Sequence, residues 1–289
     1  MDGKVVPLEE ATGLVRNGDV LGLGGYTLYR KPMAFVREVI RSRRRDLTVA
    51  SFAGSIDVDL LIGSGVASTV RSCYVGMEYL GLAPSHRRFA ESNRIKIVEE
   101  SELTFSAGLR AALQRTPCLL VRQLFETDML KVRPDIRETT CPLTGERLVA
   151  LPAVAPNVAA IHVLEADPYG NAYFRGNAGV DRELARVSDK VILTAEKLVA
   201  TEELGRRAEG VQICSFEVHA VVVAPWGAHP TSCYPHYTLD MWHLNDYVKM
   251  ARDDDQFESY LRKYVFDCLT TEDYVQAVGG IRSTRRVSL

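Results

Sequence analysis

Three short segments of the sequence place glycines and small polar or acidic residues directly after apolar runs. They are Gly24-Gly25-Tyr26-Thr27, Ala53-Gly54-Ser55 and Glu99-Glu100-Ser101-Glu102. Glycine permits close backbone approach and unusual dihedral angles, and a backbone N–H that faces a cleft can stabilise a developing oxyanion. These residue types suit a ligand site, although each segment by itself is more typical of a tight turn between a strand and a helix.

Glu102 is the carboxylate of most interest, because it lies between an apolar run at 95–98 and a helical pattern at 104–114. A glutamate there can act as a general base, orient a ligand, or simply begin the helix, where the dipole stabilises its charge. Arg30 and Lys31 follow the glycine pair and could neutralise a carboxylate or a phosphate of a ligand. The alternative for these two residues is a solvated basic pair.

A further candidate is the loop 225–234, which follows an apolar run at 219–223. Its His229 could contribute to a pocket or to a contact with another chain. Alternatively, packing of Trp226 and Pro230 fixes a purely structural loop. A catalytic pair of His229 and Cys233 is conceivable, but proximity in the sequence says nothing about the geometry of the side chains.

Several common cofactor and metal motifs are absent from the sequence. The run Gly22-Leu23-Gly24 has Thr27 where the dinucleotide fingerprint needs a third glycine. Neither a P-loop nor a GxSxG or HExxH motif occurs. The six cysteines form no CxxC pair, which disfavours a zinc knuckle and a dense disulfide framework. We therefore expect no metal site and no permanently bound cofactor.

Composition limits the class of protein further. The 289 residues are 46% hydrophobic and 25% charged, with a formal net charge of −2, as in ordinary globular proteins. This charge gives no electrostatic signature of a nucleic-acid binder. The N-terminal residues lack the apolar region of a signal peptide, and no apolar run approaches the ~18 residues of a membrane span. We expect a cytoplasmic protein that binds neither nucleic acid nor membrane.

The elements that must position these residues follow from the alternation of apolar runs and helical patterns. Strands are expected at 20–23, 47–52, 69–74, 95–99, 118–121, 158–164, 190–195 and 219–223, and helices at 7–17, 32–42, 57–62, 87–93 and 104–114. This order predicts an α/β fold with a mostly parallel sheet and helices on both faces. Ligands bind such sheets at the carboxyl ends of the strands, where the three segments should meet.

We expect one domain over residues 1–289. Within it, segment 123–150 is the least periodic, and it could be a long loop, a small excursion from the domain or a contact surface. Residues 240–279 are expected to be helical, and residues 280–289 are expected to form a frayed basic tail.

The sequence also resembles the alpha subunits of glutaconate CoA-transferases. The matching segments occur in order: GGYTLYRKPMA (24–34), DVDLLIGSG (57–65), YVGMEYLGLAP (74–84), EESE (99–102), DPYGNA (167–172) and GAHPTSCY (227–234). The similarity runs from about residue 7 to about residue 278. One departure is residues 123–128, QLFETD, where many relatives have a glycine-rich GGLGTD loop. Larger side chains there could reshape the acyl pocket, so glutaconate itself is in doubt as substrate.

The resemblance implies the fold class shared by CoA-transferases and sugar-phosphate isomerases. It also implies a hetero-oligomer of two alpha and two beta chains, with the active site between them and acyl-CoA as substrate. In this family a glutamate of the beta chain attacks the thioester, and the resulting enzyme–CoA thioester passes CoA to a second acid. The beta-type Ser-Glu-Asn-Gly segment is absent, since Ala53-Gly54-Ser55-Ile56 stands in the comparable place. The nucleophile is therefore expected from the partner.

On this chain, the resemblance and the residues together indicate one catalytic candidate, Glu102. The expected substrate-binding residues are Gly24, Gly25, Tyr26, Arg30, Gly54 and Ser55.

Two alternatives remain. The sequence is also similar to the alpha subunits of bacterial steroid-ring-degrading CoA-ester hydrolases, with which it shares RKPMAFVR (30–37) and a glutamate matching Glu102. That similarity implies hydrolytic C–C ring cleavage with Glu102 as base. A non-catalytic ligand sensor on the same fold is the other alternative, but residues 1–18 are too short for the DNA-binding helices that such sensors carry.

Overall fold

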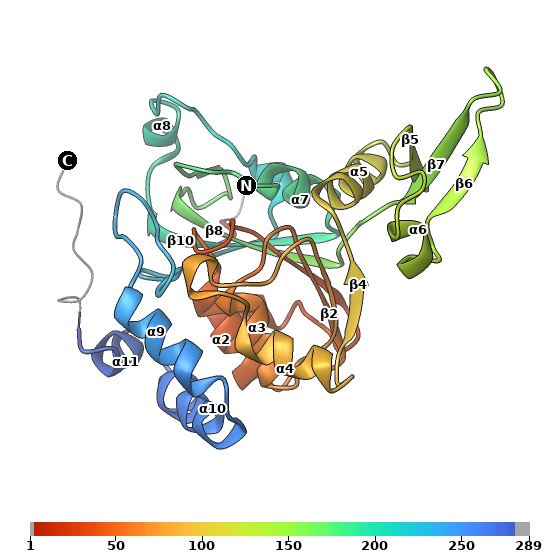
Figure 1. Cartoon of the computed structure of the whole chain (residues 1–289). Helices are drawn as coiled ribbons and strands as arrows, with labels where there is room; N and C mark the ends of the chain where they lie inside the picture. Colours follow the sequence, from red (N-terminus) through yellow and green to blue (C-terminus); the bar gives the residue numbers. More distant parts are fainter. Residues whose placement is uncertain (1–2, 281–289) are drawn as a thin grey trace.

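The computed structural model describes residues 3–280 of the chain, so the basic tail expected at 280–289 lies outside the described residues except for Gly280. Its centre is a sheet in the strand order β11-β10-β8-β1-β2-β3-β4 (Figure 1). The strands of this order pair in parallel, and a short β9 adds to β8 in antiparallel orientation. Their bounds are β1 (Val20–Leu23), β2 (Leu47–Ser51), β3 (Ala67–Ser72), β4 (Lys96–Glu99), β8 (Val158–Ala166), β9 (Ala172–Tyr173), β10 (Lys190–Leu198) and β11 (Ala220–Val223).

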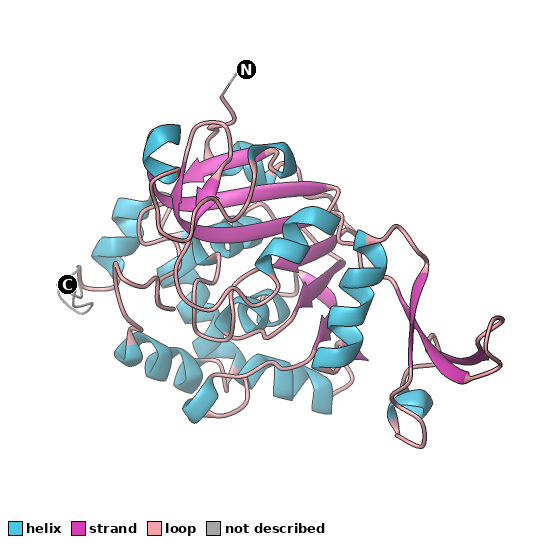
Figure 2. Cartoon of the chain, turned by 90° about the horizontal axis from the view of Figure 1, so that it is seen from above, coloured by secondary structure: helices cyan, strands magenta, loops and turns pink. Residues whose placement is uncertain are grey.

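Helices cover both faces of the sheet, which confirms the predicted α/β class (Figures 1 and 2). One face packs against α1 (Leu8–Thr12), α2 (Met33–Arg41), α3 (Ile56–Gly63), α4 (Pro84–Glu91), α9 (Met241–Met250) and α10 (Asp254–Leu261). The other face packs against α5 (Glu102–Leu113) and α7 (Asp181–Val187). The remaining short elements are η1 (Glu78–Leu80), α8 (Thr201–Leu204), η2 (Ser215–Glu217), the π-helical turn η3 (Arg262–Phe266) and α11 (Thr271–Ala277).

The apolar runs become strands because they are buried on both sides. All nine residues of β8 are buried. Val158 and Ala160 face one core and Ala159 and Ile161 the other, as the two-residue period of a strand requires. Such strands appear in the sequence as continuous apolar runs rather than alternating ones.

An arm formed by residues 118–152 projects from this body in both views (Figures 1 and 2). It contains α6 (Met129–Val132) and a separate antiparallel sheet in the order β5-β7-β6, with bounds β5 (Cys118–Val121), β6 (Arg137–Thr140) and β7 (Arg147–Pro152). The strand at 118–121 therefore exists, but its implied place in the parallel sheet was wrong. Its backbone groups pair with β7, which runs antiparallel to it.

The arm has a small apolar core of its own, built on Ile136, Val149 and Leu151 against α5. Leu124 and Phe125, from the segment that departs from the glycine-rich loop of many relatives, pack against this core. Neither side chain lines the clefts described below. The structure therefore gives these two residues a role in packing the arm.

A buried ion pair fixes the carboxyl end of β1 to the elements beside it. Lys31 and Asp57 are both fully buried, and Lys31 Nζ lies 3.2 Å from Asp57 Oδ2. The same ammonium group donates hydrogen bonds to the Gly24 carbonyl and to the Ser51 hydroxyl. Because the unpaired charge of either group would be costly in the interior, this pair ties the glycine turn to β2 and α3. The alternative of a solvated basic pair was therefore wrong for Lys31.

No helix among residues 3–280 combines the length and apolar character that crossing a membrane requires.

Lys31→Met should lower the free energy of unfolding by about 3–5 kcal/mol, because it leaves the Asp57 carboxylate buried without its charge partner. The double variant Lys31→Met/Asp57→Asn should recover part of this loss, since removing both buried charges costs less than removing one. Urea unfolding of the two single variants and the double variant gives the coupling energy. Additive losses around this cycle would contradict a direct interaction.

Candidate functional site

The three segments singled out in the sequence meet in one cleft of about 350 Å³. It lies where β1, β2, β3 and β4 end, and each of these strands contributes the loop that follows it. Its lining is Tyr26, Thr27, Phe52, Ala53, Cys73, Tyr74, Glu78, Ser101 and Glu102. The position agrees with the rule that open parallel sheets bind ligands beyond the carboxyl ends of their strands.

The turn after β1 depends on glycine at position 25. Gly25 has a φ of +77°, and a Cβ there would lie 2.5 Å from the Tyr29 carbonyl oxygen, so a side chain would not fit. The Gly25 N–H donates to Asp181 Oδ1, and the Gly24 N–H donates to the Ala160 carbonyl. Both groups are thus occupied within the protein, and these two glycines shape the turn that presents Tyr26.

Arg30 lies beneath this turn and is almost fully buried. Its Nη1 is 2.8 Å from Asp181 Oδ2, its Nη2 donates to the Asn177 carbonyl, and its guanidinium carbon lies 4.2 Å from the centre of the Phe174 ring. It does not line the cleft. In this conformation its charge stabilises the turn through Asp181, and it is not a solvated residue.

Gly54 and Ser55 join the loops of neighbouring strands. The Gly54 N–H donates to the Tyr74 carbonyl, while the Ser55 hydroxyl donates to the Thr27 carbonyl over 2.6 Å. Ser55 is fully buried, and its N–H donates to Asp57 Oδ1. The two residues therefore hold the loops after β1, β2 and β3 together, one layer behind the cleft surface.

Glu102 is exposed and stands in the first turn of α5. Ser101 begins this helix with a capping box: its hydroxyl accepts the Thr104 N–H, and Thr104 Oγ1 accepts the Ser101 N–H. Such a cap fixes the helix start, and with it the position of the Glu102 side chain at the cleft. Glu102 therefore begins the helix and lines the cleft at the same time.

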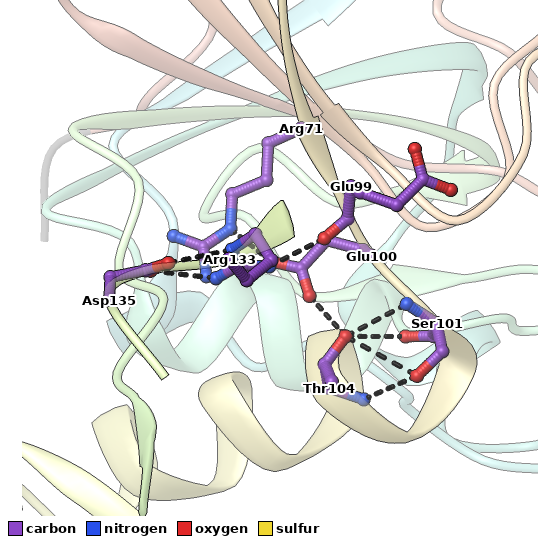
Figure 3. A network of polar contacts seen from close by, with 7 residues as sticks. All are labelled: Arg71, Glu99, Glu100, Ser101, Thr104, Arg133 and Asp135. Atoms are coloured by element: carbon purple, nitrogen blue, oxygen red, sulfur yellow. Dashed lines mark hydrogen bonds and ion pairs between the residues drawn. The ribbon is translucent and has the colours of Figure 1, made fainter. Parts of the chain in front are cut away.

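A buried network around Glu100, two residues before Glu102 in the chain, fixes the rest of this loop (Figure 3). The Glu100 carboxylate is buried and pairs with both Arg71 and Arg133, the latter over 2.9 Å, and it also accepts the Thr104 hydroxyl. Arg133 comes from the arm and donates a second hydrogen bond, 2.6 Å long, to the Glu99 carbonyl. The arm is thereby anchored to the loop that carries Glu102.

Glu78 and Cys73 also line the cleft, although we did not single them out from the sequence. Glu78 has a φ of +52° and accepts a hydrogen bond from the Thr27 hydroxyl, which directs it to the glycine turn. Its presence in the YVGMEYLGLAP segment was the one signal that could have found it. Burial, with the charges of Glu100 and Glu102, raises the pKa of the Cys73 thiol to about 12, so this thiol remains protonated near neutral pH.

The loop at 225–234 is held by internal contacts. His229 is buried, with Nδ1 2.9 Å from the Tyr274 hydroxyl and Nε2 3.1 Å from Asp240 Oδ2. Burial lowers the pKa of His229 and raises the pKa of Cys233 well above the ordinary thiol value. Both shifts favour neutral groups, and the His229 ring faces Tyr274 and Asp240, so a catalytic His229–Cys233 pair gains no support.

Within residues 3–280, one group has the side-chain types of a metal site. His162, Glu196 and Cys233 are buried, with their ligand atoms all within 4.8 Å of one another. His162 Nε2 and Glu196 Oε1 are in direct contact at 2.8 Å, and Glu196 also accepts the Tyr237 hydroxyl and the Trp226 N–H. His162 and Glu196 are thus hydrogen-bonded to one another and to their neighbours within the protein.

Known proteins share this architecture over almost the whole chain. A glutaconate CoA-transferase subunit from Acidaminococcus fermentans is 30% identical, and the alignment covers 96% of this chain and 93% of that protein. The cholesterol ring-cleaving hydrolase IpdA subunit from Mycobacterium tuberculosis is also 30% identical, over 99% of this chain and 100% of that protein. An uncharacterised protein of Archaeoglobus fulgidus is 31% identical, and the chain spans 65% of its length.

Solved structures agree with these relatives. The crystal structure of the Acidaminococcus glutaconate coenzyme A-transferase superposes with a TM-score of 0.91 at 29% identity, over 96% of this chain and 94% of that one. A decarboxylase, AibA/AibB, superposes with a TM-score of 0.81 at 27% identity, over 90% of this chain and 99% of that one. The sequence model of the coenzyme A transferase family matches residues 6–224. The chain, with its cleft at the ends of β1 to β4, therefore belongs to the coenzyme A transferase family.

Proposed function

We propose that this chain is the alpha subunit of a heteromeric CoA-transferase, which moves CoA from an acyl-CoA to a carboxylic acid in a cleft completed by a beta subunit. The observation that carries the proposal is the half-built character of the cleft. It presents exposed Glu102 and a ring of loops, but none of these loops carries the Ser-Glu-Asn-Gly nucleophile segment of the family's beta chains.

The surroundings of the cleft support a partner chain. Leu103 follows Glu102 and is exposed, as are Tyr79 and Leu82, which follow Glu78. Exposed apolar side chains that are close in the chain to residues lining a cleft suit an interaction surface. Such a surface is suited to burial against the chain that supplies the nucleophile.

In the proposed reaction, the carboxylate of the partner's glutamate attacks the thioester carbonyl, and CoA leaves as its thiolate. The thiolate then attacks the glutamyl carbonyl of the resulting anhydride, which releases the first acid and forms an enzyme–CoA thioester. The second acid takes up CoA by the reverse steps. This chain contributes one wall of the cleft. Tyr26 on the glycine turn positions the acyl group, and Glu102 on the opposite loop orients the reacting groups.

The hydrolase alternative has one specific observation in its favour. Glu78 and Glu102 both line the cleft, whereas no lysine or arginine is among its lining residues. Two carboxylates without a neighbouring cation disfavour the approach of a free acid anion, whereas a carboxylate at a cleft can serve as a general base. In that reaction Glu102 abstracts a proton during hydrolytic C–C cleavage of a CoA ester.

The first prediction of the proposed function concerns the division of labour between chains. The purified chain alone should catalyse no CoA exchange between an acyl-CoA and a free acid, because it lacks the nucleophile. Addition of a beta chain that carries the Ser-Glu-Asn-Gly glutamate should start exchange. Chromatography of the new acyl-CoA measures its rate. Exchange by the isolated chain would refute the proposal.

The second prediction separates the two reactions. In the complex, Glu102→Gln should lower kcat of CoA transfer by about tenfold or less if Glu102 only orients groups. If the complex is a hydrolase with Glu102 as general base, the same substitution should lower kcat by about 10²–10⁴-fold. Glu126→Gln, on the arm and away from the cleft lining, is the matched control. Full activity of Glu102→Gln in both assays would remove this residue from the mechanism.

The third prediction concerns the anchor of the Glu102 loop. Arg133→Met should lower the free energy of unfolding by about 3 kcal/mol, because Glu100 keeps only Arg71 as a charge partner. It should also lower kcat more than it raises KM, since a displaced loop misplaces Glu102. Arg122→Met, which removes an exposed ion pair with Glu146 on the same arm, should cost about 0–1 kcal/mol. Equal effects of the two variants would contradict the anchoring role.

A further inference from the structure

Tyr26 lines a second cavity as well as the carboxylate cleft. This cavity has a volume of about 590 Å³, and it is formed by the glycine turn, the 176–177 loop and the 232–239 loop. Its volume falls in the range of about 300–1,000 Å³ that is typical of sites for small organic ligands. Because the Tyr26 side chain belongs to both walls, the two cavities adjoin at this residue.

The lining of the cavity is aromatic and uncharged. Four tyrosines, Tyr26, Tyr29, Tyr234 and Tyr237, contribute to it together with Leu239, and its other lining groups are also neutral. Arg175 lies near the rim, 6.0 Å from the centre of the Tyr234 ring, but its Nε is 3.7 Å from a Glu209 oxygen and is paired with it. Tyrosine faces accept apolar rings, whereas a carboxylate in such a cavity would lose its hydration without gaining a cation.

The floor of the cavity is buried and its rim is exposed. Tyr237 is buried, donates its hydroxyl to Glu196 Oε1 over 2.5 Å, and stacks on Trp226 with ring centres 4.5 Å apart. Tyr29 and Tyr234, by contrast, are each 42% exposed. The cavity is therefore preformed around Tyr237, which favours ligand binding because little ordering is needed.

We propose that this cavity binds the acyl portion of the CoA ester, and that this portion is an apolar, ring-bearing group without a second carboxylate. The proposal rests on the proposed function in one respect, the placement of the thioester in the carboxylate cleft. It adds the substrate class: the CoA ester of a hydrophobic monocarboxylic acid is bound in preference to that of a dicarboxylic acid.

Trp226 provides a direct test, because it stacks on the floor of the cavity and the chain has two tryptophans. In a Trp242→Phe background Trp226 is the only tryptophan, and its emission should change saturably on titration with 4-cyclohexylbutanoyl-CoA. The expected affinity for this ester is at least tenfold higher than for glutaryl-CoA. The titration is performed on the full chain and on the complex with its beta chain.

A charge introduced into the cavity should reverse this preference. Thr238 is an exposed lining residue, so Thr238→Arg adds a cation without disturbing buried contacts. It should weaken binding of 4-cyclohexylbutanoyl-CoA and strengthen that of glutaryl-CoA, so that their affinity ratio falls by tenfold or more. Thr140→Arg, at an exposed position of β6 on the arm, is the matched control and should leave the ratio unchanged.

Three results would overturn the proposal. The first is that the unsubstituted protein binds glutaryl-CoA as tightly as the cyclohexyl ester, or more tightly. The second is that the cyclohexyl ester binds without changing Trp226 emission. The third is that binding of this ester is lost when the beta chain covers the cavity. The proposed function fails separately. If Trp226 emission responds to the ester but the complex transfers no CoA, only the transferase reaction is refuted. If the complex transfers CoA but prefers glutaryl-CoA, only the assignment of the acyl group to this cavity is refuted.

Discussion

Burial of two positive charges beneath the glycine turn is the constraint on which the site depends. Arg30 and Lys31 are adjacent in the chain, yet they pair with carboxylates on opposite faces of the sheet, Asp181 at the start of α7 and Asp57 in α3. Each pair is stable only while the helix that carries its carboxylate stays in place. The turn between β1 and α2 is therefore clamped from both helical layers, and Tyr26 is held at the boundary of the two cavities.

A second clamp acts on the opposite wall. Glu100 is buried between Arg71 of β3 and Arg133 of the arm (Figure 3). It lies two residues before Glu102 in the chain. The arm has its own small core and its own sheet, so it behaves as a body attached to the domain partly through Arg133. A displacement of the arm would act on the Glu102 loop directly, through the carbonyl of Glu99 and the carboxylate of Glu100.

The sequence was sufficient for features that local patterns determine. Residues buried on both faces of the sheet appear as apolar runs, and the convergence of the three loops follows from the geometry of parallel strands. The arm was not predictable, because the run at 118–121 is as apolar as the strands of the main sheet, and only its pairing with β7 distinguishes it. Arg30 and Asp181 are 151 positions apart, so nothing local indicates that this arginine is buried. Glu78 was missed because it lies four residues beyond the end of the strand expected at 69–74, and its contact with Thr27 spans 51 positions of the chain.

The contrast between the clamped floor and the exposed rim has a consequence for how this scaffold can diversify. A substitution at Gly25 disturbs the backbone of the turn, and a substitution at Arg30 leaves a buried carboxylate unpaired. Both should therefore impair folding. Tyr29, Tyr234 and Thr238 have solvent on one side, and they can be exchanged with little loss of stability. If the cavity binds the acyl group as proposed, its selectivity can change through substitutions at the rim, while the arrangement of the floor is retained.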